Sequence, residues 1–166
     1  MKLIDIIIFL IPLISGYTMS LLCPMKKESG SNIPARPPAW VFGVVWPILY
    51  ILMGLSWVLL RKEKDKTIVD ILFFLLIIAL NSWLFAYSCL KKKKIALYIL
   101  LISLVFVLAI WGYSIGTIYM FYLTPLVVWL IFACMLNFTE INIIPETFFN
   151  KLKESVTGVD IFQSIE

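Results

Sequence analysis

Charged and apolar positions are sharply separated along the chain. Four stretches contain no Asp, Glu, Lys or Arg, and they cover residues 6–25, 39–60, 71–90 and 95–139. The hydrocarbon core of a bilayer is about 30 Å thick, and a helix of roughly 20 apolar residues crosses it. Each of the first three stretches has about that length. The pattern therefore predicts an all-α integral membrane protein.

The fourth stretch is too long for one crossing. As a continuous helix, its 45 residues would extend roughly 68 Å, about twice the thickness of the bilayer core. The sequence GYSIG at 112–116 carries two glycines and a serine, so we expect the chain to fold back there. The prediction is a five-helix bundle in one domain, 1–166, with a tail at 145–166. The expected helices are 6–25, 39–60, 71–90, 95–111 and 117–141.

Composition supports this assignment. Apolar residues make up 62% of the chain and charged residues 14%, a balance that a soluble domain of this size would expose to water unfavourably. A signal peptide is an alternative for the first stretch, since Lys2 precedes it. Against that alternative, Pro12 interrupts the stretch, no small-x-small cleavage site follows, and the stretch is long enough to span a membrane.

The positions of the basic residues predict an orientation. On the N-terminal side are five of them, Lys2, Arg61, Lys62, Lys64 and Lys66, and on the opposite side are nine, Lys26, Lys27, Arg36, Lys91, Lys92, Lys93, Lys94, Lys151 and Lys153. Because basic residues concentrate on the cytosolic side, the excess predicts an external N-terminus and a cytosolic C-terminal tail. We interpret the four-lysine run as a topology signal and headgroup anchor. Nothing in the pattern favours nucleic-acid binding.

Few residues are suited to metal or proton chemistry. The chain has no histidine, which removes the commonest metal ligand and the usual proton shuttle, so no metal site is expected. Cys23, Cys89 and Cys134 are widely spaced and form no ligand motif, and we interpret them as small apolar packing residues. No acidic residue lies deep in a predicted helix, which argues against a proton-coupled transporter.

Two proline-containing segments flank the predicted helices. The loop at 24–38 is long for a compact bundle, and its prolines favour a functional lid over a disordered connection. After the fifth helix, Pro145 predicts a stop. Beyond it, the tail mixes charged and apolar residues, so both a short interfacial helix and a disordered segment remain open.

Two helix faces are the candidates for a ligand cavity. One carries Trp46, Tyr50, Met53 and Trp57 at helical spacing, and the other carries Pro125, Trp129, Ala133, Leu136 and Asn137. An aromatic stripe is also typical of plain packing or of an interfacial belt, which suits Trp40 at a helix start. Asn81 and Asn137 are amides in apolar surroundings and need partners, either on a neighbouring helix or on a ligand.

The second predicted helix carries a specific resemblance. Residues 36–54 read RPPAWVFGVVWPILYILMG, which closely resembles the P-P-x-W-x-x-G-P-V-W-x-x-L-Y-x-x-M-G signature of the TspO/translocator protein family. This family is also called the peripheral-type benzodiazepine receptor or tryptophan-rich sensory protein family. Residues 80–81, Leu-Asn, and residues 125–137, PLVVWLIFACMLN, resemble its third and fifth helices. The resemblance covers about residues 34–141.

The resemblance implies a five-helix bundle, often a homodimer, whose cavity under the first loop binds porphyrins, sterols or benzodiazepine-type drugs. It implies no required cofactor, and porphyrin (protoporphyrin IX or heme) is a possible ligand. The implied ligand-binding residues are Trp40, Trp46, Tyr50, Asn81, Trp129, Ala133, Leu136 and Asn137. Trp46 and Trp129 match the indoles that the family associates with light-dependent porphyrin degradation, so they are the candidate catalytic residues. The membrane could be mitochondrial outer, endoplasmic reticulum or bacterial inner.

Departures from the family pattern affect two regions. In the third helix the family has Asn-x-x-Trp, whereas here Trp83 follows Asn81 by two residues. The family's tryptophan is therefore absent or shifted by one residue, onto a different face of the helix. At the end of the fifth helix, Phe138 and Asn142 replace the tyrosine and the basic residue of the sterol-associated segment. We therefore expect a binding protein for porphyrins or similar flat apolar ligands. Light-driven porphyrin degradation is a second hypothesis, and a sterol or lipid transport protein is the alternative.

Overall fold

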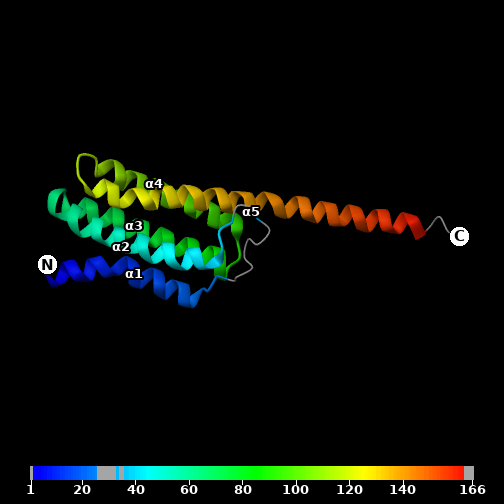
Figure 1. Cartoon of the computed structure of the whole chain (residues 1–166), viewed down its shortest axis with the longest axis horizontal. Helices are drawn as coiled ribbons and strands as arrows, with labels where there is room; N and C mark the ends of the chain where they lie inside the picture. The colour runs from blue at the N-terminus through cyan, green and yellow to red at the C-terminus, as the bar shows by residue number, and fades with distance from the viewer. Residues whose placement is uncertain (1, 26–32, 34–35, 163–166) are drawn as a thin grey trace.

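The computed structural model describes residues 2–25, 33 and 36–162, with side chains described as far as residue 142. Within these residues the chain is built from helices, without strands (Figure 1). In chain order they are α1 (Leu3–Leu22), α2 (Ala39–Glu63), α3 (Lys66–Leu84), its π-helical continuation η1 (Phe85–Cys89), α4 (Lys93–Tyr113) and α5 (Tyr119–Phe162). The predicted all-α fold is confirmed.

Five helices are long and apolar enough to cross a membrane, over Leu3–Leu22, Ala39–Glu63, Lys66–Cys89, Lys93–Tyr113 and Tyr119–Asn142. The two termini lie at opposite ends of the bundle, as an odd number of crossings requires (Figure 1). Outward-facing side chains such as Phe74, Val105 and Phe121 are large, apolar and exposed, which suits a lipid solvent. The protein is therefore a multi-pass integral membrane protein.

The bundle has two distinct ends, and we name them by their connections. At the N-terminal end, α1 begins, α2 turns into α3, and α4 turns into α5. The predicted fold-back at 112–116 is confirmed here, since α4 ends at Tyr113 and Gly116 adopts a φ of +86°. At the long-loop end, α1 and η1 end and α2 and α4 begin. Of the predicted lid, residues 26–32 and 34–35 lie outside the described part of the chain.

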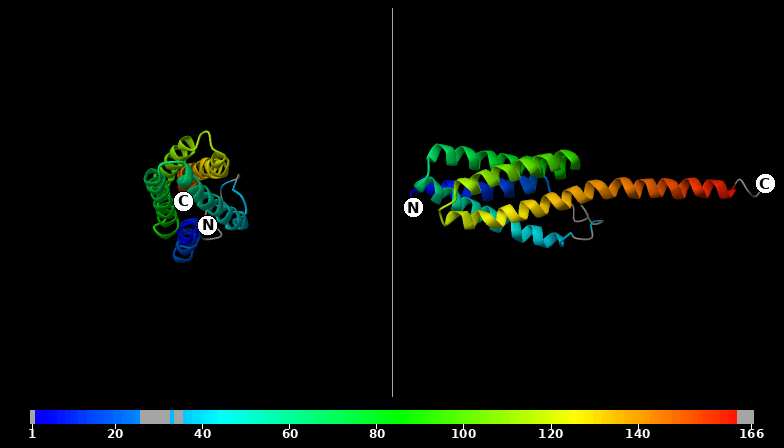
Figure 2. Two further views of the ribbon diagram at one scale, coloured as in Figure 1. Left: turned by 90° about the vertical axis from the view of Figure 1, so that its left-hand side faces the viewer. Right: turned by 90° about the horizontal axis from the view of Figure 1, so that it is seen from above.

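The predicted stop at Pro145 is wrong. The backbone of α5 is helical from Tyr119 to Phe162, and it extends well beyond the other helices (Figure 2, right). A proline removes one intrahelical hydrogen bond and crowds the preceding turn, but it can bend a helix without ending it. The third helix also differs from prediction at its start. It begins at Lys66, because Asp65 caps it by accepting a hydrogen bond from the Ile68 amide at 3.0 Å.

Glycine allows α1 to pack closely on α2. A Cβ atom added to Gly54 would lie 2.2 Å from the carbonyl oxygen of Phe9, so no larger residue fits at this crossing. At Gly16 an added Cβ would lie 2.3 Å from the ring of Tyr50. Small residues let membrane helices approach each other closely, and here they do so at two levels of the same interface. Viewed end-on, the helices surround a shared core (Figure 2, left), which includes the fully buried Phe73.

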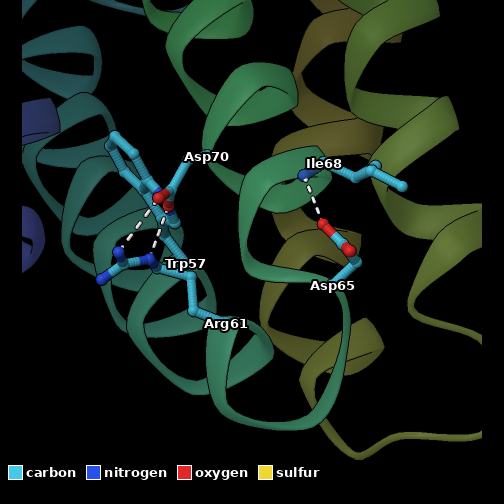
Figure 3. A network of polar contacts seen from close by, with 5 residues as sticks. All are labelled: Trp57, Arg61, Asp65, Ile68 and Asp70. Carbon is cyan, nitrogen blue, oxygen red and sulfur yellow. Dashed lines mark hydrogen bonds and ion pairs between the residues drawn. The ribbon is translucent and has the colours of Figure 1, made fainter.

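At the N-terminal end, a polar network joins α2 to α3 (Figure 3). The indole Nε1 of Trp57 donates to Oδ1 of Asp70 at 2.8 Å, and the guanidinium of Arg61 donates to Oδ2 of Asp70 at 3.0 Å. The ring of Trp57 also stacks on that of Phe73, with centroids 5.4 Å apart. Trp57 and Met53, placed with the candidate ligand face on sequence grounds, are therefore buried packing residues.

The interpretation of the cysteines as packing residues is wrong for two of the three. Cys23 and Cys89 form a disulfide between the ends of α1 and η1, with their Cα atoms 5.3 Å apart, whereas Cys134 is free. The pair is separated by 66 residues in sequence. Only the packing of the helices brings the two positions together, so the spacing along the chain could not reveal the bond.

Candidate ligand-binding site

Aromatic side chains from three helices meet near the long-loop end. We call Phe42, Trp46, Tyr50, Trp83, Tyr87 and Trp129 the aromatic cluster. The ring of Trp46 is its centre, with centroid distances of 5.6 Å to Tyr50, 5.5 Å to Trp83 and 6.4 Å to Trp129. Helical spacing explains the α2 members, since Phe42, Trp46 and Tyr50 follow one another at intervals of four residues.

The cluster separates two cavities. The larger has a volume of about 430 Å³ and lies among α1, α2 and α3, where Gly16, Phe42, Trp46, Tyr50 and Trp83 line it. Its volume falls in the range of about 300–1,000 Å³ that is usual for small-molecule sites. The smaller, of about 40 Å³, lies among α2, α3 and α5. It has room for water molecules but not for a ligand of drug size.

The structure brings together most of the residues predicted from sequence. The small cavity is lined by five of them, Trp46, Trp129, Ala133, Leu136 and Asn137, and the large cavity by Trp46 and Tyr50. Trp46 belongs to both linings, and its indole lies between the two cavities. The predicted face of α5 therefore meets α2 as expected, but little empty space remains there. The roomier cavity is on the α1 side of Trp46.

Two predicted residues lie apart from these cavities. Trp40 is 69% exposed and lines neither of them, which is the arrangement expected of an interfacial belt residue at the start of a helix. Asn81 also lines neither cavity, and its Oδ1 atom is buried without a hydrogen-bond partner among the described residues. Trp40 and Asn81 are therefore the two predicted site residues that lie outside both cavity linings.

Trp83 occupies the place that sequence reasoning gave to Asn81. Two residues apart on a helix means about 200° of rotation, so the two side chains cannot both face the same cavity. Asn81 and Trp83 therefore lie on different faces of α3, and the indole of Trp83 is the side chain that lines the cavities. Trp83 lines both cavities, and its ring is 5.8 Å from that of Tyr87, one helical turn later. The four-residue spacing of Trp83 and Tyr87 is the feature of the sequence that indicates an aromatic face on this helix.

Several buried polar atoms at the site have no partner in the described part of the chain. They include Nε1 of Trp83, Nε1 of Trp129, and the nitrogen and oxygen of the Asn137 side-chain amide. Asn137 is only 4% exposed. An unpaired buried polar group costs about 1–3 kcal/mol. Three donors and one acceptor around one small cavity therefore form a polar edge suited to ordered water or to the heteroatoms of a ligand.

The charged residues of the site form a rim on the side of the long-loop end. Glu140 contacts Nζ of Lys93 and accepts a hydrogen bond from the hydroxyl of Tyr87 at 2.9 Å. The ammonium of Lys93 also lies 4.8 Å from the centroid of the Tyr87 ring. Arg36 lines both cavities and places its guanidinium carbon 5.7 Å from the centroid of the Phe42 ring. The rim therefore combines the carboxylate of Glu140, which is paired with Lys93, with the guanidinium of Arg36, a group that binds carboxylates by charge-assisted hydrogen bonds.

Pro47 lies inside α2 and contributes to the large cavity. Because proline has no N–H, the carbonyl of Gly43 lacks its normal intrahelical donor, and both residues line this cavity. A free carbonyl in an apolar wall is a hydrogen-bond acceptor for a ligand N–H group.

Comparison with known proteins places this architecture in a family. The sequence model of the TspO/MBR family matches residues 7–141, which include most or all of each crossing and every residue that lines the two cavities. The chain belongs to the TspO/MBR family. A relative of this TspO/MBR member is Protein CrtK from Rhodobacter capsulatus, with 30% identity over 133 residues, 75% of this chain and 82% of the relative. At the level of the family, membership supports a membrane binding protein for tetrapyrrole- or sterol-related molecules.

Proposed function

We propose that this TspO/MBR member binds porphyrins and similar flat apolar molecules in the large cavity among α1, α2 and α3. The observation that carries the proposal is the pair of indoles from Trp46 and Trp83, with centroids 5.5 Å apart, lining a cavity of about 430 Å³. Flat aromatic ligands gain affinity by stacking on such rings and by leaving water.

The polar groups supply orientation. Porphyrin carboxylates would lie toward Arg36 at the rim, and pyrrole N–H groups toward the Gly43 carbonyl that Pro47 leaves without a donor. The chain has no histidine, so an iron porphyrin would lack its commonest protein ligand. We therefore propose that binding occurs through the face of the macrocycle, with the metal-free form as the test ligand.

A fluorescence titration with protoporphyrin IX tests this proposal. Trp46→Leu removes the indole that lies between the two cavities, so we expect the dissociation constant to rise at least about tenfold, which corresponds to ~1.4 kcal/mol. Trp40→Leu is the matched control, because Trp40 is exposed and lines neither cavity, and its affinity should stay at the wild-type value. Saturable binding with the same affinity in Trp46→Leu would contradict the proposed site.

Light-driven degradation of the bound porphyrin is a second proposal. It is favoured by the contact between Trp46 and Trp129, whose rings meet edge to face at 6.4 Å. Trp46 lines the cavity of the proposed ligand, and Trp129 contacts Trp46 from the side of the small cavity, so two oxidisable indoles lie in series next to the ligand. Loss of the porphyrin Soret band under illumination in air, compared between wild type, Trp46→Phe and Trp129→Phe, tests it. Equal bleaching in all three would leave only photosensitised damage.

The sterol alternative has less support in the structure. Phe138, at the position of the family's tyrosine, is exposed on the outer face of α5, and Asn142 supplies no positive charge. A sterol exchange assay between liposomes measures this activity directly. We expect transfer rates to be equal with and without the protein, and acceleration by the protein would favour the alternative.

A further inference from the structure

The disulfide closes one side of the proposed ligand cavity. Cys23 directly follows α1 and is 3% exposed, and it lines the large cavity together with Met25 and Arg36. Cys89 is the last residue of η1 and is exposed. The bond therefore ties the end of α1 to the end of α3 at the point where the cavity approaches the membrane surface.

The last turns of α1 have few buried contacts. The close contacts of α1 with α2 are made by Phe9 and Gly16, and no residue of α1 after Gly16 is buried. Met19 packs partly buried against the core, whereas Tyr17, Leu21 and Leu22 are exposed. A segment with few buried contacts opens at low free-energy cost unless it is tied down. Here the covalent tie is the Cys23–Cys89 bond.

The charge pattern places this bond in an unusual setting. The long-loop end carries nine of the 14 Lys and Arg residues, so the positive-inside rule assigns it to the cytosol. Cytosolic disulfides are rare, and those that occur are mostly transient. Cys89 is exposed and precedes the lysine run at 91–94, and nearby positive charge stabilises the thiolate that departs during exchange. These features describe a bond that can be reduced and re-formed.

We propose that Cys23 and Cys89 are a reversible thiol–disulfide site that controls ligand access to the large cavity. This proposal rests on the proposed function for its ligand, but not for its redox step. In reduction, the thiolate of a small dithiol attacks the exposed sulfur of Cys89, and Cys23 leaves as a thiolate and takes up a proton. The second thiol of the reductant then resolves the mixed disulfide. It releases the Cys89 thiol and the oxidised, cyclic form of the reductant.

Reduction removes the tie between α1 and η1. The last turns of α1 can then move away from α3, which widens the mouth of the cavity between them. Because both binding and release pass through this mouth, the association and dissociation rates should rise together, with a smaller change in affinity. In the oxidised state, the cavity exchanges its contents slowly.

Two measurements on the full chain in nanodiscs test the proposal, each with and without dithiothreitol. One is hydrogen exchange of the peptide that covers residues 16–23, which needs no ligand. The other is the stopped-flow association rate of protoporphyrin IX. In wild type and in the matched control Cys134→Ser, we expect the reductant to increase the hydrogen-exchange rate and the association rate several-fold. Cys89→Ser and Cys23→Ser should show the faster values without reductant and no further response.

The outcomes separate the two proposals. Faster hydrogen exchange on reduction, with no porphyrin binding in either state, would contradict the proposed ligand and leave the redox tie supported. Unchanged exchange and unchanged rates after confirmed reduction would overturn the tie. A bond that resists dithiothreitol, or that remains fully oxidised when thiols are trapped in freshly lysed cells, would also overturn it, because the bond would then be a permanent structural link.

Discussion

Trp57, near the N-terminal end, and Trp83, near the long-loop end, are 4% and 7% exposed, yet their indole N–H groups differ. That of Trp57 donates to Asp70 at 2.8 Å, and its ring stacks on Phe73. That of Trp83 has no partner among the described residues, and its ring lines two cavities. The first indole serves the stability of the bundle. The second leaves stacking surface and a donor available, which is the arrangement of a binding site.

The largest expected effect is at the N-terminal end. Asp70→Ala removes the carboxylate that neutralises Arg61 and accepts from Trp57. Because Arg61 is largely buried and Asp70 is partly exposed, we expect a loss of about 2–3 kcal/mol in the free energy of unfolding. Thermal unfolding in detergent measures it. Lys62→Ala is the control, since the side chain of Lys62 is about half exposed and its Nζ lies 3.5 Å from Oδ2 of Asp5. Asp5 keeps its hydrogen bond from the Lys2 amide, so stability should change by less than about 1 kcal/mol. Equal losses in the two variants would contradict this account of the network.

The packing of α1 on α2 gives the next largest effect. In Gly54→Ala the new methyl group meets the carbonyl oxygen of Phe9, so the two helices must separate. We expect a loss of about 1–3 kcal/mol in unfolding free energy. Gly112→Ala is its control, because no described atom lies within 4 Å of the added Cβ. A melting temperature of Gly54→Ala as high as that of Gly112→Ala would show that the crossing is looser than described.

The two indoles themselves give a double comparison. Trp57→Phe keeps a ring but loses the hydrogen bond to Asp70, so stability should fall by about 1–2 kcal/mol while protoporphyrin IX affinity is unchanged. Trp83→Phe removes a donor that has no partner among the described residues, so stability should change by less than about 0.5 kcal/mol, while the porphyrin dissociation constant rises roughly tenfold. Melting and fluorescence titration on the same samples measure both quantities. The reverse assignment would refute the distinction between the two ends.

The smallest effect is expected at Trp40. Its ring is exposed at the start of α2 and lines neither cavity, so Trp40→Phe should leave porphyrin affinity at the wild-type value and stability within about 0.5 kcal/mol. The same titration measures it. A weaker affinity in this variant would return Trp40 to the site and extend the cavity toward the membrane surface.

Sequence reasoning predicted the helices well because the bilayer imposes its own length scale. Uncharged stretches of about 20 residues identify the crossings directly, and a 45-residue stretch requires a turn at Gly112 and Gly116. Helix ends were less predictable. At Pro145 the local rule predicted a stop, whereas the backbone of α5 continues to Phe162.

The candidate site was predictable only in part. Helical spacing along one element placed Trp46 and Tyr50 on one face, and the family pattern placed Trp129 opposite them. Features that depend on packing between distant segments were out of reach. These include the disulfide between Cys23 and Cys89 and the larger empty volume on the α1 side of Trp46.

Porphyrin binding among α1, α2 and α3 is tested best by an experimental structure of the full chain with protoporphyrin IX bound. We expect the face of the macrocycle to be in van der Waals contact with the indoles of Trp46 and Trp83, at about 4 Å. Its carboxylates should lie toward Arg36. A macrocycle found instead on the lipid-facing surface, or between α2 and α5 against Trp129 and Asn137, would contradict the account.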